Sequence, residues 1–477
     1  MSPRRHRRSW YRRIYGAVRR GPGIGPMVVL AMVFITPVGM GIMLDGSTYD
    51  TWGAFVWGPV LMILMFPLSR YMANRTEEPE LAGFFFFAAA LKIVVGGALR
   101  FYMVDAVYGA GDSMRYDEAA KSLVPQFHQG SFADLGKVTG TRFIEVVDGI
   151  VQAIIGQSMV ATFFVFSALG FIGLCLLYLA FCDSVPGGDR TLYRRLIFLT
   201  PTLWFWPASV GKEAFLMFTI GIAVYGFVRL TNGFLMGIPI TAVGLWGTTV
   251  VRPHFAFMLI VGMVAAAPPT ITRHRSAEGV RQRPLLLRIL LPLVVVVSIP
   301  VVLSAMESFF HIEQLSISSA SDVRDEATRR TSKEDGPQFT PPDVGNPVGL
   351  IEGVVTVTAR PFPWEAAGFQ RLAALETVAL GGICGVALYR RRRSVGALLG
   401  QRMARFAIAY AVVFGWAFSA VANFGILARQ RSLLWPFLFI LVCLAPRPPS
   451  DDEDLDLRLV GQSALGREPE LVEPTPA

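Results

Sequence analysis

The sequence predicts an all-α integral membrane protein that crosses the bilayer many times. Of its 477 residues, 53% are hydrophobic and only 17% are charged, and the mean hydropathy of +0.48 is far above that of soluble proteins. The apolar residues come in blocks close to the roughly 20 residues that a membrane-spanning helix needs. Arginines gather in short segments between these blocks, as in cytoplasmic loops, so the net charge of +9 does not indicate nucleic-acid binding.

The apolar blocks predict about twelve transmembrane helices. We expect them at about 27–44, 54–68, 81–104, 158–181, 195–210, 213–230, 234–250, 255–269, 286–305, 371–389, 404–422 and 432–446. The transmembrane domain then covers residues 27–446, with large external loops at about 105–157 and 306–365. The second of these loops is either a lid over a site or a disordered connection.

The two ends of the chain differ from this domain. Residues 1–26 form a basic arm with eight arginines, which acts either as a topology signal or as a contact for anionic lipid headgroups. Residues 447–477 are acidic and proline-rich, which predicts a disordered tail. The four cysteines show no spacing typical of a disulfide framework or a zinc site.

The basic clusters favour a plasma-membrane protein with both termini in the cytoplasm. An even number of spans puts the termini on one side, and the arginine-rich arm puts that side inside. Counting onward then places three further clusters inside, namely Arg190 to Arg195, Arg273 to Arg283 and Arg390 to Arg393. The candidate polar motifs all fall on the opposite, external face.

An acid-rich stretch, Tyr108 to Ala120, follows the third apolar block. Asp112 and Tyr116 lie four residues apart and share one face if the stretch is helical, and Asp117 and Glu118 add carboxylates. Asp112 could deprotonate an acceptor hydroxyl, or hold a divalent cation such as Mg²⁺ or Mn²⁺ beside a phosphate. The structural alternative is that Asp112 merely caps a helix.

Two cations lie within the third apolar block, although buried charge is costly there. Lys92 and Arg100 are eight residues apart, which is about 80° of helical rotation, so both can face one crevice. Arg100 could instead extend to the interface. Further along, residues 143–157 place Asp148 and Gln152 among apolar residues at helical spacing, which predicts an amphipathic helix on the outer bilayer surface.

The remaining external loops carry cations and aromatic residues suited to an anionic ligand. Lys212 and Glu213 lie between two closely spaced apolar blocks and either bind phosphate or close a hairpin as an ion pair. Arg252 and Arg360 each directly precede a proline, so they project from restricted bends and are suited to phosphate or to lipid headgroups. The residues in these other loops are Arg252, His254, Arg360, Trp364, Glu365, Arg429 and Arg431.

Together these motifs resemble those of multi-spanning bacterial envelope-polysaccharide proteins. The similar types are the GT-C-like glycosyltransferases that use polyprenyl-linked sugars and the exopolysaccharide or O-antigen polymerases. The resemblance rests on Lys92 and Arg100 before Tyr108-Gly-Ala-Gly-Asp112-x-x-x-Tyr116, on Trp206-Pro-x-x-x-Gly-Lys212-Glu213, on Arg252-Pro253, on Arg360-Pro-Phe-Pro-Trp-Glu365 and on Arg429-x-Arg431.

The resemblance implies a reaction centre at Asp112, because GT-C enzymes carry an acidic residue in their first large external loop. Here Ser113 follows Asp112 in place of a second acid, and the loop follows the third apolar block instead of the first. These departures weaken the expectation of a metal-dependent transferase and make a polymerase, whose lipid pyrophosphate would be held by arginines, a serious alternative.

We therefore expect an enzyme that transfers a sugar or glycan from a polyprenyl-(pyro)phosphate carrier at the external face. Its partners would be the lipid-linked donor, a glycan acceptor and membrane lipids. Asp112 would be the base or cation ligand, the later-loop cations would hold phosphate, and Tyr116 and Trp364 would stack on sugar. The alternatives are a flippase that draws the phosphate past Lys92 and Arg100, and a structural subunit without a converging site.

Overall fold

The computed structural model describes residues 48–267, 339–344, 346–390 and 399–444, together with 299, 300, 302, 304, 328, 329 and 392. Within these residues every element is a helix. The predicted basic arm, the first span at 27–44, most of the span at 286–305 and the acidic tail lie outside the described residues.

The helices follow one another with short connections. Their bounds are α3 Tyr49–Arg75, η1 Pro79–Leu81, α4 Ala82–Ala90, η2 Leu91–Gly96, α5 Gly97–Tyr102, η3 Met103–Tyr108, α6 Asp112–His128, α7 Thr141–Ile155, α8 Met159–Ser184, α9 Arg190–Leu199, α10 Pro201–Phe205, α11 Lys212–Thr231, α12 Gly237–Val251, α13 Pro253–Ala266, α16 Pro347–Ala359, α17 Gln370–Arg390, α18 Arg402–Phe418, α19 Phe424–Gln430, η5 Arg431–Leu433 and α20 Trp435–Val442.

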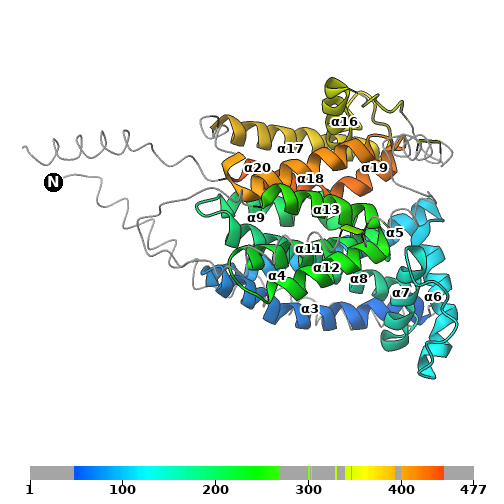
Figure 1. Ribbon diagram of the computed structural model, residues 1–477. Helices are drawn as coiled ribbons and strands as arrows, with labels where there is room; N and C mark the ends of the chain where they lie inside the picture. The colour runs from blue at the N-terminus through cyan, green and yellow to red at the C-terminus, as the bar shows by residue number, and fades with distance from the viewer. Residues whose placement is uncertain are drawn as a thin grey trace, which may run out of the picture.

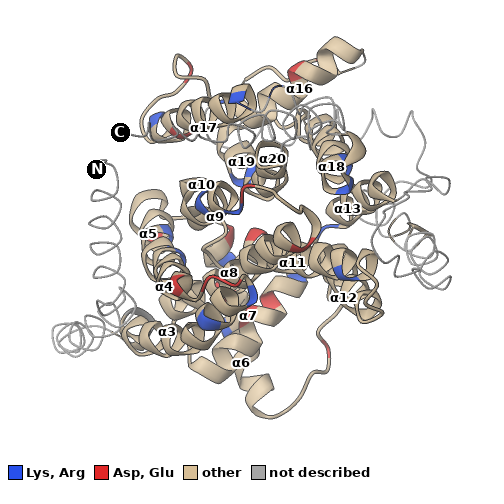
Figure 2. Cartoon of the chain, turned by 90° about the vertical axis from the view of Figure 1, so that its left-hand side faces the viewer, with Lys and Arg blue, Asp and Glu red and all other residues tan. Residues whose placement is uncertain are grey.

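The long helices lie side by side as a bundle, with α6 and α7 at one end (Figure 1). At this end, called the α6 end below, the indole of Trp57 in α3 donates a hydrogen bond of 2.9 Å to the carbonyl of Ile155, the last residue of α7. At the other end, called the Arg75 end, Arg75 pairs with Asp183 at 2.9 Å. Viewed along the bundle, most of the helical surface is uncharged (Figure 2).

Five helices in the described part of the chain are long and apolar enough to cross a membrane. They are Trp52–Arg75, Pro79–Tyr108, Met159–Ser184, Lys212–Thr231 and Gln370–Arg390, and a sixth span results if the bent pair of Phe424–Leu433 and Trp435–Val442 is counted. These helices are those expected of a membrane protein, whereas the number twelve stays a prediction. The predicted span at 195–210 is interrupted, because α9 ends at Leu199 and α10 begins at Pro201.

Small residues let the central helices approach closely. A Cβ atom added to Gly221 of α11 would lie 2.5 Å from the carbonyl oxygen of Gly173 in α8, which is too close for any side chain. Such glycine contacts are typical of helices packed within membranes, where association depends on close backbone packing. This contact holds α11, and with it the start of that helix at the α6 end, against the centre of the bundle.

The third span departs from a regular α-helix at two places. Leu91–Gly96 and Met103–Tyr108 are π-helical, and Arg100 lies in the α-helical turn between them. Because a π-helical segment has a wider turn than an α-helix, it changes the direction in which the following side chains point. The angle between Lys92 and Arg100 is therefore not that of a regular helix.

Candidate functional site

Helix α6 begins at the predicted acid-rich stretch. Gly111 is the cap residue and Asp112 is the first helical residue, so the carboxylate of Asp112 is not a helix cap. It pairs instead with Arg115 on the same helix and with Arg429 at 3.5 Å. The hydroxyl of Ser113 donates to the carbonyl of Val210 at 2.7 Å, which ties the start of α6 to the segment that precedes α11.

The start of α11 brings Lys212 and Glu213 to the same place, where they contact different partners. The ammonium group of Lys212 donates to the hydroxyl of Thr141 at 2.8 Å and lies 6.0 Å from the centre of the Tyr116 ring. The alternative of a simple Lys212–Glu213 hairpin pair is therefore not what the structure shows. Tyr116 is buried one turn into α6, on the same face as Asp112.

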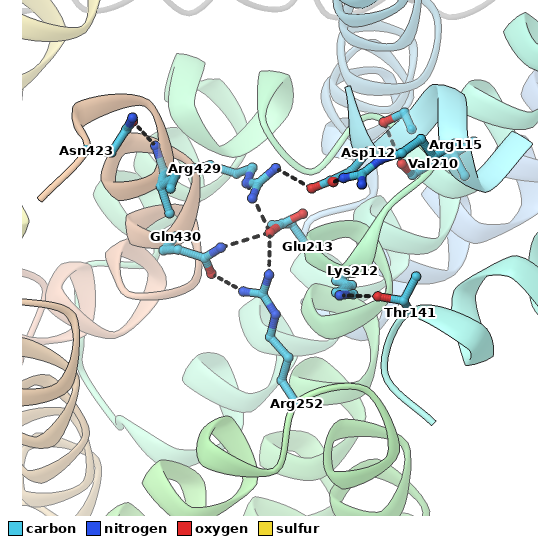
Figure 3. A network of polar contacts seen from close by, with 12 residues as sticks. Asp112, Arg115, Thr141, Val210, Lys212, Glu213, Arg252, Asn423, Arg429 and Gln430 are labelled. Atoms are coloured by element: carbon cyan, nitrogen blue, oxygen red, sulfur yellow. Dashed lines mark hydrogen bonds and ion pairs between the residues drawn. The ribbon is translucent and has the colours of Figure 1, made fainter. Parts of the chain in front are cut away.

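Glu213 is the centre of a buried polar network (Figure 3). Its Oε1 atom lies 3.3 Å from Nε of Arg429 and 3.4 Å from Nη2 of Arg252. The amide of Gln430 donates to the same oxygen at 2.9 Å, and the amide oxygen of Gln430 accepts from Arg252 at 2.6 Å. One carboxylate thus holds two guanidinium groups from distant parts of the chain.

Helix ends position both of these arginines. Asn423 caps α19, its Oδ1 accepting from the backbone N–H groups of Gly425 and Ile426 at 2.9 and 3.2 Å, and this fixes the short helix that carries Arg429. Arg252 adopts an extended backbone between α12 and α13, directly before Pro253. The proline cannot continue the preceding helix, so Arg252 projects from a fixed break.

The network borders a cavity of about 110 Å³. Four cationic side chains and two carboxylates are among its lining groups, which gives a formal charge of +2. The ionisable lining residues are Arg100, Tyr108, Asp112, Tyr116, Lys212, Glu213, Arg252 and Arg429. The structure brings these side chains together at the starts of α6 and α11.

Arg100 enters the cavity as a cation with unused hydrogen-bond donors. Its guanidinium carbon lies 4.9 Å from the ring centre of Trp206 and 5.4 Å from that of Phe205. The side chain is only 7% exposed, so Arg100 does not extend to an aqueous interface. Its Nε and Nη1 atoms are buried and find no hydrogen-bond partner among the described residues, while the residue itself lines the cavity.

Tyr116 keeps its proton in this surrounding. Burial, followed by the charges of Asp112 and Glu213, raises the pKa of the Tyr116 phenol to about 12. At neutral pH the phenol is therefore protonated and can donate a hydrogen bond.

Three of the predicted residues lie elsewhere. Lys92 is buried and donates to the backbone carbonyls of Leu203 and Pro207 at 3.0 and 2.8 Å, so it supports the broken α9–α10 segment and lies outside the cavity lining. Asp117 faces away from the cavity, pairing with Lys121 and accepting from Gln152, each at 2.9 Å. Glu118 is exposed.

Five further predicted residues also lie outside the cavity lining. Arg360 pairs with Glu365 at 3.7 Å, Trp364 is exposed, and Arg431 is buried and donates to the carbonyl of Arg360 at 2.8 Å. The ring of His254 lies 4.9 Å from that of Phe255 and 6.0 Å from that of Phe418.

Gln430 is the network residue that sequence reasoning missed. It lies between two arginines that were considered, and its contact with Glu213 spans 217 positions along the chain. In the sequence, only its position between Arg429 and Arg431 points to Gln430 as a member of the site.

A metal site at Asp112 remains a prediction. Within the described ranges, no group of three or more His, Cys, Asp or Glu side chains gathers where it could hold a metal ion. Asp112 forms ion pairs with the guanidinium groups of Arg115 and Arg429, and such positively charged neighbours disfavour a metal cation.

Comparisons with protein-family models, with curated proteins and with solved structures found no match to this chain. The resemblance to envelope-polysaccharide enzymes therefore rests on the motifs alone, and the site must be interpreted from its own chemistry.

Proposed function

We propose that the protein is a membrane glycosyltransferase that takes a sugar or glycan from a polyprenyl-(pyro)phosphate carrier at the α6 end of the bundle. The observation that carries the proposal is the cavity, in which four cations surround Asp112 and Tyr116. Guanidinium groups bind phosphate oxygens in pairs of parallel hydrogen bonds. The apolar bundle would leave the hydrocarbon tail of the carrier in the membrane beside the cavity.

Backbone groups support an anion at the same position. Both α6 and α11 begin at the cavity with a glycine as cap residue, Gly111 and Gly211, and neither receives a side-chain cap. The free N–H groups of a helix N-terminus attract anions. Asp112 and Glu213, in the first turns of these helices, are the anions that now benefit from this potential, and a phosphate at the unpaired donors of Arg100 would add to them.

The groups present suffice for a balanced transfer step. An acceptor hydroxyl attacks the anomeric carbon of the donor, its proton passes to Asp112, and the bond from that carbon to the phosphate oxygen breaks. The negative charge that develops on the leaving phosphate is stabilised by the arginines, with the neutral Tyr116 as an additional donor. A phosphate that recruits Arg429 also frees the Asp112 carboxylate from one of its two arginine partners, which leaves it accessible to the acceptor hydroxyl.

The flippase alternative receives less support. Carrying a phosphate through the membrane requires cations along the depth of the path. Lys92, the deepest cation considered, is committed to two backbone carbonyls, whereas the cavity cations lie together at one level. A polymerase would use the same chemistry with a growing glycan as donor.

The test is the lipid-linked glycan profile of cells that lack the protein, complemented with variants. In these cells we expect truncated glycan or accumulated single repeat units. The wild type and Glu352→Gln should restore the normal glycan profile, whereas Asp112→Asn should not. Glu352 is an exposed carboxylate on α16 outside the cavity lining and is the matched control. Full glycan output from a folded Asp112→Asn protein, or intermediates that accumulate on the cytoplasmic side, would contradict the proposal.

A further inference from the structure

A row of stacked side chains ends in an exposed tryptophan. The rings of Phe424 and Phe339 stack with centres 4.9 Å apart, the guanidinium carbon of Arg360 lies 4.5 Å from the centre of Phe339 and 5.6 Å from that of Phe362, and Phe362 stacks on Trp364 at 5.0 Å. We call this row the Trp364 stack. Trp364 stacks on Phe362 on one side and is 80% exposed overall, so the side of the ring turned away from Phe362 is open.

The plane of the Trp364 ring is held in place. Phe362 and Trp364 are nearly parallel, with 18° between their planes, and each follows a proline, which restricts the backbone. The carboxylate of Glu365 accepts from the backbone N–H of Phe362 at 3.1 Å and lies 3.7 Å from Arg360. An aromatic residue that only anchors a protein at a lipid interface needs apolar area and a polar edge, but no fixed plane.

Arg431 connects the Trp364 stack to the cavity. It donates to the carbonyl of Arg360 at 2.8 Å and lies two residues after Arg429, whose side chain borders the cavity. Helices α16 and α19 both lie at the α6 end (Figure 1). A chain of sugars that begins at Asp112 therefore has a second protein surface at the same end of the bundle.

We infer that the open face of Trp364 is a carbohydrate-binding subsite that takes a pyranose ring of the acceptor glycan. The inference rests on the proposed function and names the position of its second substrate. One face of a pyranose presents polarised C–H groups, and the negative face of an aromatic ring attracts them. Because the cavity would hold the phosphate of the donor, the acceptor must be bound through its sugar rings. A flat aromatic ring that is already held in position binds a sugar ring at low entropic cost.

The experiment compares Trp364→Leu and Trp364→Phe with Trp246→Leu. Leucine keeps apolar area for lipid but loses the aromatic face, whereas phenylalanine keeps a face. Trp246 is an exposed tryptophan on α12 that lies outside the stack, and it controls for lipid contact. For Trp364→Leu we expect the KM for the acceptor to rise roughly three- to tenfold, with the kcat and the KM for the donor unchanged, and only a small change for Trp364→Phe and Trp246→Leu.

A second readout does not require turnover. Glycan released by mild acid from the lipid carrier of the host is titrated calorimetrically into the purified protein, and Trp364→Leu should weaken its binding by the same factor. If Trp364→Leu binds the glycan as tightly as the wild type, Trp364 is not a carbohydrate-binding subsite. If the same variant also binds lipid vesicles more weakly, Trp364 is a lipid anchor instead. Absence of transfer in the wild type overturns the proposed function instead, while the titration still decides about the Trp364 stack.

Discussion

Replacing Glu213 by glutamine tests the buried network directly. Glutamine has nearly the same shape, and its amide oxygen can still accept the hydrogen bond from Gln430. The substitution therefore removes little except one negative charge. What it leaves behind are two guanidinium groups, those of Arg252 and Arg429, whose distances to that charge are 3.4 and 3.3 Å.

Removing one partner of a buried ion pair costs about 3–5 kcal/mol, because the remaining charge has been taken out of water without compensation. At 1.4 kcal/mol per factor of ten, we expect the folding equilibrium of Glu213→Gln to fall by roughly two to three and a half orders of magnitude. The measurement is equilibrium unfolding in mixed micelles with rising SDS content, monitored by circular dichroism.

Two further variants make this result specific to the network. Glu352→Gln removes an exposed carboxylate and should change the unfolding free energy by less than about 0.5 kcal/mol. Combining Glu213→Gln with Arg252→Gln should recover part of the loss, because the number of unpaired charges falls. If the unfolding free energy of Glu213→Gln lies within 1 kcal/mol of the wild-type value, the two arginines do not depend on this carboxylate and the reasoning is refuted.

Three other predictions follow from contacts elsewhere. Burial raises the pKa of Asp148 from 3.8 to about 8. Between these two pH values the folded protein keeps a proton on Asp148 that the unfolded chain has released, so the unfolding free energy should fall as the pH rises from about 4 to about 8. Asp148→Asn should reduce this pH dependence in unfolding measurements. Lys92→Met should lower the unfolding free energy by about 1–3 kcal/mol, while calorimetry shows the same affinity for a short-chain polyprenyl phosphate. Gly221→Ala should cost about 1–3 kcal/mol through its contact with Gly173, whereas Gly381→Ala, with open space around it, should not destabilise; an equal cost in both would contradict the packing argument.

Much of the site could be predicted because charge in an apolar sequence is rare. Asp112, Lys212, Arg252 and Arg429 fall in separate loops, and counting apolar blocks assigned them to one face without any knowledge of packing. The structure brings them to one cavity at the α6 end. Hydropathy thus predicts at which end of a helix a residue lies. That is enough to predict which polar residues gather at the same end of the bundle, although not which of them touch.

The same reasoning could not predict which neighbours face the cavity. The sequence predicts the same role for Arg429 and Arg431, yet side chains two positions apart in a helix point to nearly opposite sides, and of the two only Arg429 borders the cavity. Arg360 was grouped with the phosphate-binding cations, but its partner is Glu365. Rotation about a helix axis and long-range pairing are set by packing, which periodicity in a nearly uniform apolar block does not reveal.

The π-helical segment Leu91–Gly96 makes the length of the third span as important as its composition. Arg100 reaches its position beside Trp206 and the cavity only after this wider turn. A π-helical turn accommodates about one residue more than an α-helical turn, so losing one residue from this segment would restore a regular helix and leave the direction of Arg100 nearly unchanged. A single-codon deletion at Ala89, in the regular α-helix before the segment, would instead rotate Arg100 by about 100° away from the cavity, while leaving every charged and aromatic side chain in the protein intact.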